Sequence, residues 1–140
     1  MADASALLET WRMLTWTRQS VATGEIADAM GPAPVGYIAY HADGRMMAVV
    51  FARDRHLEGA LPSTAEKAAL FDSMLAYCAT YTVEGNCIIH HVDGAWNPAW
   101  RGALVRPYRI EGRRLFISGA PGEDPLTGEA VVYALEFEKV

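Results

Sequence analysis

The stretch VGYIAYHADGRMMAVVFAR, residues 35–53, decides the fold class. It contains two runs rich in aromatic and β-branched residues, 35–41 and 45–53, on either side of the pair Asp43-Gly44. An Asp-Gly pair favours a tight hairpin turn, because that turn needs a positive φ that glycine adopts readily. The sequence therefore predicts an antiparallel hairpin here. Pro32 and Pro34 mark a break before it, since proline cannot donate to a strand ladder.

The same strand pattern recurs along the chain on both sides of one helical segment. Ser63 and Glu66 have the spacing of a capping box, and the apolar residues after them recur at helical spacing. This predicts a helix over residues 64–77, between the third and fourth strands. The remaining predicted strands, with tight turns at 84–86 and 111–113 and a polar loop at 120–128, are residues 7–18, 79–84, 87–94, 99–110, 114–118 and 130–138.

Eight antiparallel strands joined in order can close on themselves, which removes the exposed edges. We therefore expect an all-β protein, a single domain over residues 1–140, folded as an up-and-down antiparallel eight-stranded β-barrel. A two-sheet sandwich has a similar sequence pattern. A closed barrel of this size has room inside for side chains and one small ligand.

Composition narrows the function classes. The 140 residues carry a net charge of -5, and no basic run is available to neutralise phosphates, so we expect no nucleic acid partner. No leader pattern and no apolar stretch of bilayer length occurs, which predicts a cytoplasmic protein without a membrane partner. Cys78 and Cys87 are expected to be free thiols, because a hairpin places them too far apart to bridge. No motif suggests a metal or a cofactor. The sequence does not decide between a monomer and a homodimer.

The alternation of side chains along a strand predicts which residues face inward. In residues 7–18, Trp11 and Met13 share one face, and Leu14 and Trp16 the other. In residues 87–94, Asp93 shares a face with His91, which makes His90 the interior histidine. The expected inward set also contains polar side chains from other strands: Tyr81, Arg106, Tyr108 and Tyr133. A few convergent polar groups in an apolar interior are typical of a small-molecule site.

Several motifs, in order over nearly the whole chain, resemble one family. They are Trp11-Arg12-Met13-Leu14, residues 31–40, Asp43-Gly44-Arg45-Met46, Tyr77-Cys78-Ala79-Thr80-Tyr81, His90-His91-Val92, Asn97-Pro98-Ala99-Trp100-Arg101-Gly102 and Arg106. The chain resembles the lipocalin-like domain family of small bacterial and fungal proteins. That family usually has a glycine where Cys78 or Ala79 stands, which puts the packing near the helix end in doubt. The resemblance implies a lipocalin-like barrel; some such barrels catalyse cyclisations or isomerisations, and others only bind.

Three functions follow as hypotheses. The first is binding of a small apolar or aromatic molecule, neutral or anionic, with its polar end fixed by His90, Arg106 and Tyr81. The second is a cofactor-independent isomerase, cyclase or lyase acting on a secondary-metabolite or catabolic intermediate. There His90 is the acid or base, and Arg106 or a tyrosine stabilises negative charge. The third is a partner-binding barrel with a filled core.

The expected ligand contacts are aromatic. They are Trp11, Tyr37, Tyr40, Trp100, Tyr108 and Tyr133. Each candidate also has a purely structural interpretation. His90 could be a hydrogen-bonded core residue, and Arg106 could stack on Trp11 or Trp100. The tyrosines could be core residues with satisfied hydroxyls.

Overall fold

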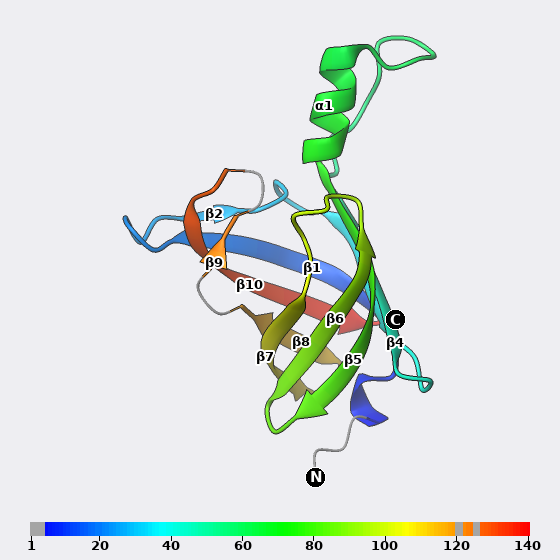
Figure 1. The fold of residues 1–140 in the computed structure, drawn as a ribbon, viewed down its shortest axis with the longest axis vertical. Coiled ribbons are helices and arrows are strands. Elements are labelled where there is room, and N and C mark those ends of the chain that lie inside the picture. Colours follow the sequence, from blue (N-terminus) through cyan, green and yellow to red (C-terminus); the bar gives the residue numbers. More distant parts are fainter. Residues whose placement is uncertain (1–4, 120–121, 125–126) are drawn as a thin grey trace.

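The computed structural model describes residues 5–119, 122–124 and 127–140, and within them eight antiparallel strands form a closed barrel (Figure 1). Each pairs with the next, and the last pairs with the first. They are β1 (Glu9–Ser20), β3 (Val35–Tyr40), β4 (Arg45–Phe51), β5 (Met74–Glu84), β6 (Cys87–Ala95), β7 (Ala103–Glu111), β8 (Arg114–Ser118) and β10 (Ala130–Lys139). The predicted fold class is confirmed.

Four further elements accompany the eight barrel strands. The short strands β2 (Ile26–Asp28) and β9 (Gly122–Glu123) pair with β1 and β10. A 3₁₀ turn, η1 (Ser5–Leu7), precedes β1, and the helix α1 (Thr64–Asp72) joins β4 to β5. The sequence analysis assigned the β2 residues to a loop, so α1 follows the fourth strand of the chain and not the third. The predicted loop 120–128 contains β9, and its residues 120–121 and 125–126 lie outside the described part.

The predicted hairpin of residues 35–53 forms as β3 and β4, with Val35 opposite Phe51. Gly36 permits a close approach between the two strands. A Cβ added there would lie 2.8 Å from the Val49 carbonyl oxygen and 2.9 Å from the Val50 Cα. Contacts this short involve backbone atoms, which cannot turn aside as a flexible side chain can, so any larger residue would push the strands apart.

The predicted faces of β1 are wrong beyond Met13, because the strand contains a β-bulge. Met13 pairs with Phe137 and Thr15 with Glu136, so Leu14 is an extra residue without a partner. An extra residue shifts the alternation by one position. Trp16 therefore faces the interior together with Trp11 and Met13, and all three are buried.

The helix is shorter than predicted. The capping box is confirmed, since Ser63 accepts from the Glu66 backbone and the Glu66 side chain accepts from the Ser63 backbone. The helix ends at Asp72 instead of residue 77 because β4 pairs with the chain from Met74 onward. Residues 74–78 thus form a strand because pairing with β4 outweighs the helical spacing of their apolar side chains.

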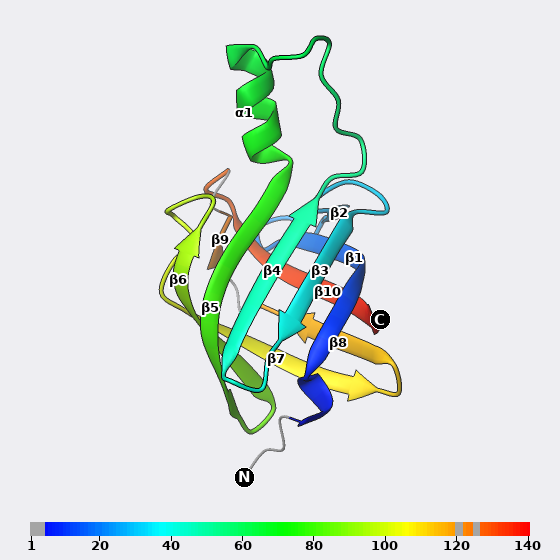
Figure 2. The ribbon, with the colours of Figure 1, turned by 90° about the vertical axis from the view of Figure 1, so that its right-hand side faces the viewer.

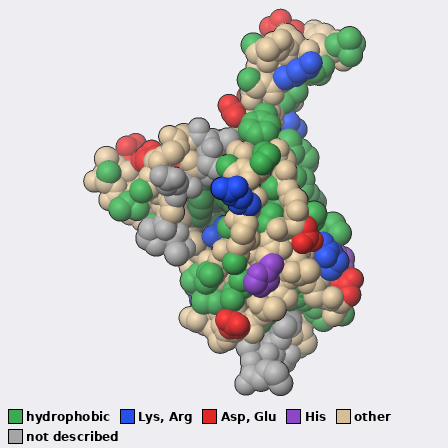
Figure 3. Space-filling view, in the orientation of Figure 1, with side chains coloured by type: hydrophobic (Ala, Val, Ile, Leu, Met, Phe, Trp, Pro, Cys, Tyr) green, Lys and Arg blue, Asp and Glu red, His purple; other side chains and the backbone are tan. Residues whose placement is uncertain are grey.

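α1 projects away from the barrel (Figure 2). None of its residues is buried. Hydrophobic side chains lie at its base and at its far end (Figure 3), and among the exposed residues of this region are Phe71, 40% exposed, and Leu61, 83% exposed. No helix in the described ranges is both long and apolar enough to span a membrane. Cys78 and Cys87 are both free.

Candidate functional site

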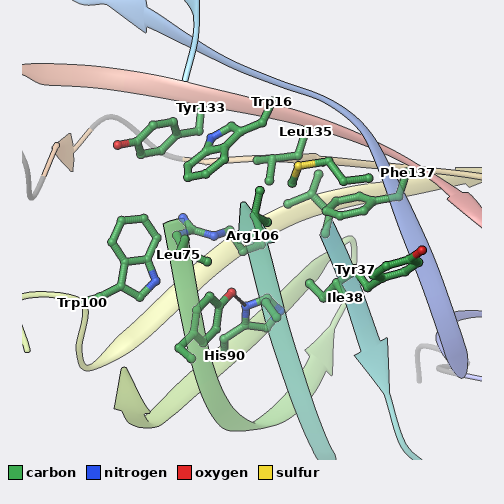
Figure 4. A pocket seen from close by; sticks show the side chains of 15 residues that line it. Trp16, Tyr37, Ile38, Leu75, His90, Trp100, Arg106, Tyr133, Leu135 and Phe137 are labelled. Carbon is green, nitrogen blue, oxygen red and sulfur yellow. Dashed lines mark hydrogen bonds between the residues drawn. The ribbon is translucent and has the colours of Figure 1, made fainter. Parts of the chain in front are cut away.

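The barrel encloses a cavity of about 40 Å³ (Figure 4). That volume accommodates about three water molecules, since one water needs roughly 10–15 Å³. Every barrel strand contributes to the wall, and most of the lining is apolar. The lining residues are Met13, Trp16, Tyr37, Ile38, Ala48, Val50, Leu75, Tyr77, His90, Trp100, Arg106, Ile117, Tyr133, Leu135 and Phe137.

His90, on β6, is the central polar group of the wall. It is 1% exposed, whereas His91 is exposed, as the position of Asp93 predicted. The Tyr40 hydroxyl lies 2.8 Å from its Nε2 and the Tyr77 hydroxyl 2.8 Å from its Nδ1. Burial, followed by the charge of Arg106, lowers the pKa of His90 to about 3. A neutral imidazole has one donor and one acceptor nitrogen, so one tyrosine donates to the ring and the other accepts from it.

Arg106, on β7, brings a positive charge to the cavity. Its register opposite Ile88, a fully buried residue of β6, sets it on the inward face, as predicted. The described part of the chain offers its guanidinium neither a hydrogen-bond partner nor an ion pair, and no described carboxylate lines this cavity. Gly119 leaves space for the guanidinium, since a Cβ added there would lie 3.2 Å from Nη1 of Arg106.

The four tryptophans fall into two pairs. Trp11 donates its Nε1 hydrogen to the Leu7 carbonyl at 2.9 Å, and Trp96 donates to the Phe71 carbonyl at 3.0 Å. Trp16 and Trp100, the two that line the cavity, have buried Nε1 atoms without a hydrogen-bond partner among the described residues. Buried donors are normally satisfied, so two exceptions in one cavity need an explanation.

Aromatic rings form one side of the cavity. Tyr133 lies between the two tryptophans, with its ring centroid 5.6 Å from that of Trp16 and 6.3 Å from that of Trp100. Trp100 also contacts Tyr77, at 6.3 Å. A neighbouring space of about 20 Å³ shares Trp16, Trp100 and Tyr133 with the main cavity, so these rings separate the two.

The family-model description "Lipocalin-like domain" matches residues 9–138. The chain belongs to the lipocalin-like domain family. The resemblance inferred from the sequence motifs is therefore confirmed. A comparison with curated proteins gives no match. Lipocalin-like barrels typically hold one small hydrophobic ligand in the interior.

The lipocalin-like barrel brings five of the predicted site residues together around its cavity. They are Tyr37, His90, Trp100, Arg106 and Tyr133. Tyr37 belongs to the outward face of β3: it is 42% exposed, and its hydroxyl points away from the cavity in Figure 4. Tyr40 does not line the cavity but supports it through His90.

Three predicted site residues lie elsewhere in the lipocalin-like barrel. Trp11 is fully buried toward the η1 end. Tyr81 donates its hydroxyl to the His41 carbonyl at 2.8 Å and packs edge-on against Tyr40. Tyr108 is half-buried beside an outer groove that Phe116 and Pro107 also line.

Two important cavity residues, Tyr77 and Trp16, were missed by the sequence analysis. Tyr77 was placed at the end of the helix, and Trp16 on the strand face opposite to that of Trp11 and Met13. The alternation Leu75, Tyr77, Ala79, all buried, was the available signal for a strand at Tyr77. No sequence signal in β1 predicts the bulge that turns Trp16 inward. The described residues contain no group of three or more His, Cys, Asp and Glu side chains positioned to hold a metal ion.

Proposed function

We propose that this protein binds a small apolar or aromatic molecule inside its barrel. The observation that carries the proposal is the cavity itself, which is lined mainly by aromatic and aliphatic side chains. Its donors include the buried indole nitrogens of Trp16 and Trp100, which have no hydrogen-bond partner among the described residues, and the guanidinium of the half-buried Arg106. A closed apolar wall with a few polar groups is the usual composition of a small-molecule site.

The size of the cavity defines how a ligand would fit. Pockets for drug-sized ligands measure about 300–1,000 Å³, so the space of about 40 Å³ must widen. Trp100 is half-buried and separates the main cavity from the space beside it. We expect the ring of Trp100 to turn when a ligand enters, because the His90 side of the cavity is fixed by two buried hydrogen bonds.

Binding is favoured over catalysis by the state of His90. The enzyme hypothesis needs His90 to accept or release a proton, but hydrogen bonds with Tyr40 and Tyr77 engage both of its nitrogens. Its lowered pKa also keeps the ring neutral through most of the physiological range. We therefore assign His90 a supporting role in the wall of the site.

The indole N–H resonances of the four tryptophans test the proposal. Toluene, a neutral apolar probe, should shift the NMR signals of Trp16 and Trp100 in a saturable way, while Trp11 stays unchanged. Each signal is assigned by its own Trp→Phe variant. Leu135→Phe, which narrows the cavity, should weaken the toluene effect, and Val105→Phe, on the outer face of β7, should not.

Absence of any saturable shift at Trp16 and Trp100 would overturn the proposal and favour the filled-core barrel. If Leu135→Phe proves unstable, Ile117→Phe serves the same purpose, since Ile117 also lines the cavity. Native mass spectrometry of the freshly purified protein gives an independent measurement, because a retained small molecule adds directly to the mass.

A further inference from the structure

The cavity contains more hydrogen-bond donors than acceptors. The potential acceptors on its polar side are His90 and Tyr77, and these are already bonded to each other, with Tyr40 completing the set. Among the described residues, the indole N–H groups of Trp16 and Trp100 have no hydrogen-bond partner. The guanidinium of the half-buried Arg106 also makes no hydrogen bond to a described residue. Guanidinium and indole groups donate and never accept, so only a ligand rich in acceptors completes the site.

The cavity also has an excess of positive charge. Arg106 carries a positive charge and is half-buried, and burying an ion is costly without a counter-ion. Elsewhere in this protein arginines near the interior are paired: Arg18 lies 2.9 Å from Glu129 and 3.5 Å from Asp124. Arg106 has no such partner among the described side chains, and the planar fork of its guanidinium matches a carboxylate.

The tryptophans supply an internal comparison. Trp11 and Trp96, outside the cavity, donate to backbone carbonyls, so the fold does provide acceptors for indole groups. It provides none for Trp16, which is only 6% exposed, or for the buried Nε1 of Trp100. In Figure 4 the guanidinium of Arg106 lies between these two rings. The unmatched donors thus gather at one part of the wall.

We propose that the ligand is a small aromatic carboxylic acid, whose carboxylate is bound by Arg106 and the indole N–H groups of Trp100 and Trp16. The aromatic part of the ligand packs against Tyr133 and the aliphatic wall around Leu135. This inference rests on the proposed function and adds the chemical class of the ligand. Gly119 acts as a positioning residue, since its missing side chain leaves the guanidinium free to face the cavity.

The test compares 4-methylbenzoate with 4-methylbenzamide, which has nearly the same shape and no charge. Binding is measured at neutral pH by the indole N–H shifts and by calorimetry. The wild-type protein should bind the benzoate about tenfold more tightly than the benzamide, because charge-assisted hydrogen bonds are the stronger ones. Arg106→Gln should remove this preference, and Trp100→Phe should reduce it by about threefold.

Arg109→Gln is the matched control, because Arg109 lies on the same strand, faces outward and is paired with Glu111. It should leave both affinities unchanged. Equal affinity for benzoate and benzamide in the wild type would overturn the carboxylate assignment while leaving small-molecule binding intact. Failure of both compounds and of toluene to shift Trp16 and Trp100 would overturn the proposed function as well.

Discussion

Toward the η1 end of the barrel, Trp11 is fully buried and its indole nitrogen donates to the Leu7 carbonyl. Five residues further along the same strand, Trp16 is also buried, but its nitrogen finds no hydrogen-bond partner in the described part of the chain. The first region is packed and satisfied, as protein cores usually are. The second contains the cavity, the unpaired charge of Arg106 and two unpaired indoles. The difference teaches that one barrel wall is packed and hydrogen-bonded in one half and, in the other, surrounds a cavity with donors that no described residue engages.

The largest effect on stability should come from truncating a side chain in the packed half of the barrel. Trp11→Ala should lower the free energy of unfolding by about 3–5 kcal/mol, because it leaves a cavity and an unpaired Leu7 carbonyl. Trp100→Ala should cost less than half as much, since that ring is half-buried and loses no hydrogen bond. Urea denaturation of both variants measures the contrast; equal losses would show that the two halves do not differ in this way.

The next effect depends on pH and belongs to His90, at the boundary of the two halves. Its pKa is about 3 in the folded protein and near 6.5 in the unfolded chain, so the unfolded state binds the extra proton. The stability contributed by neutral His90 is complete above about pH 6.5 and is lost progressively toward pH 3. The expected loss is up to about 1.4 kcal/mol per pH unit.

The measurement for His90 is a series of unfolding curves between about pH 6.5 and 5.5, a window above the usual range of carboxylate titration. His90→Gln should flatten the pH dependence relative to the wild type. His91→Gln, an exposed neighbour, should leave the slope as it is. A slope that survives in His90→Gln would mean that another group carries the proton linkage.

In the cavity half of the barrel, we expect one substitution to increase stability, by a smaller amount. Arg106→Met should raise the free energy of unfolding of the ligand-free protein by about 1 kcal/mol, because it replaces an unpaired charge with an apolar chain. Arg18→Met should instead lower it, since Arg18 is paired with Asp124 and Glu129. Thermal unfolding compares the two, and a loss of stability in Arg106→Met would show that the charge is already satisfied without a ligand.

The smallest expected change in stability concerns the η1 end of the barrel. Glu9, the first residue of β1, has a φ of 93°, a conformation that strains any residue with a Cβ. Glu9→Gly should stabilise the protein by about 0.5 kcal/mol in urea denaturation, because the relieved strain exceeds the entropic cost of glycine. Thr10→Gly, one position later in the same strand, is the control and should destabilise it. If both variants destabilise equally, the strain at Glu9 is already relieved by its surroundings.

The sequence was sufficient for the fold and for half of the site. Hairpin turns and alternation predicted the closed barrel, and alternation alone placed His90 and Arg106 inside it. These predictions succeed where strands are regular, because side-chain direction then follows from counting. The last strand behaved in this way, with Tyr133, Leu135 and Phe137 all lining the cavity.

The remaining half of the site depends on interactions between distant segments. Tyr77 becomes a strand residue because β4 pairs with it through Ala48, twenty-nine positions away, and no local pattern contains that pairing. Trp16 faces inward because of the extra residue at Leu14. The unpaired state of the Trp16 and Trp100 nitrogens is a property of the packed interior and has no sequence signature.

The bulge at Leu14 has a consequence for how related chains are aligned. A strand without Leu14 would pair Thr15 with Glu136 and Trp16 with Leu135 in an unbroken ladder, so the same side chains would still face inward. Leu14 thus behaves as a one-residue insertion. A homologue with a gap at this position would preserve the lining of the cavity, whereas an alignment that distributes the gap elsewhere in β1 would assign the wrong face to every residue between the two positions.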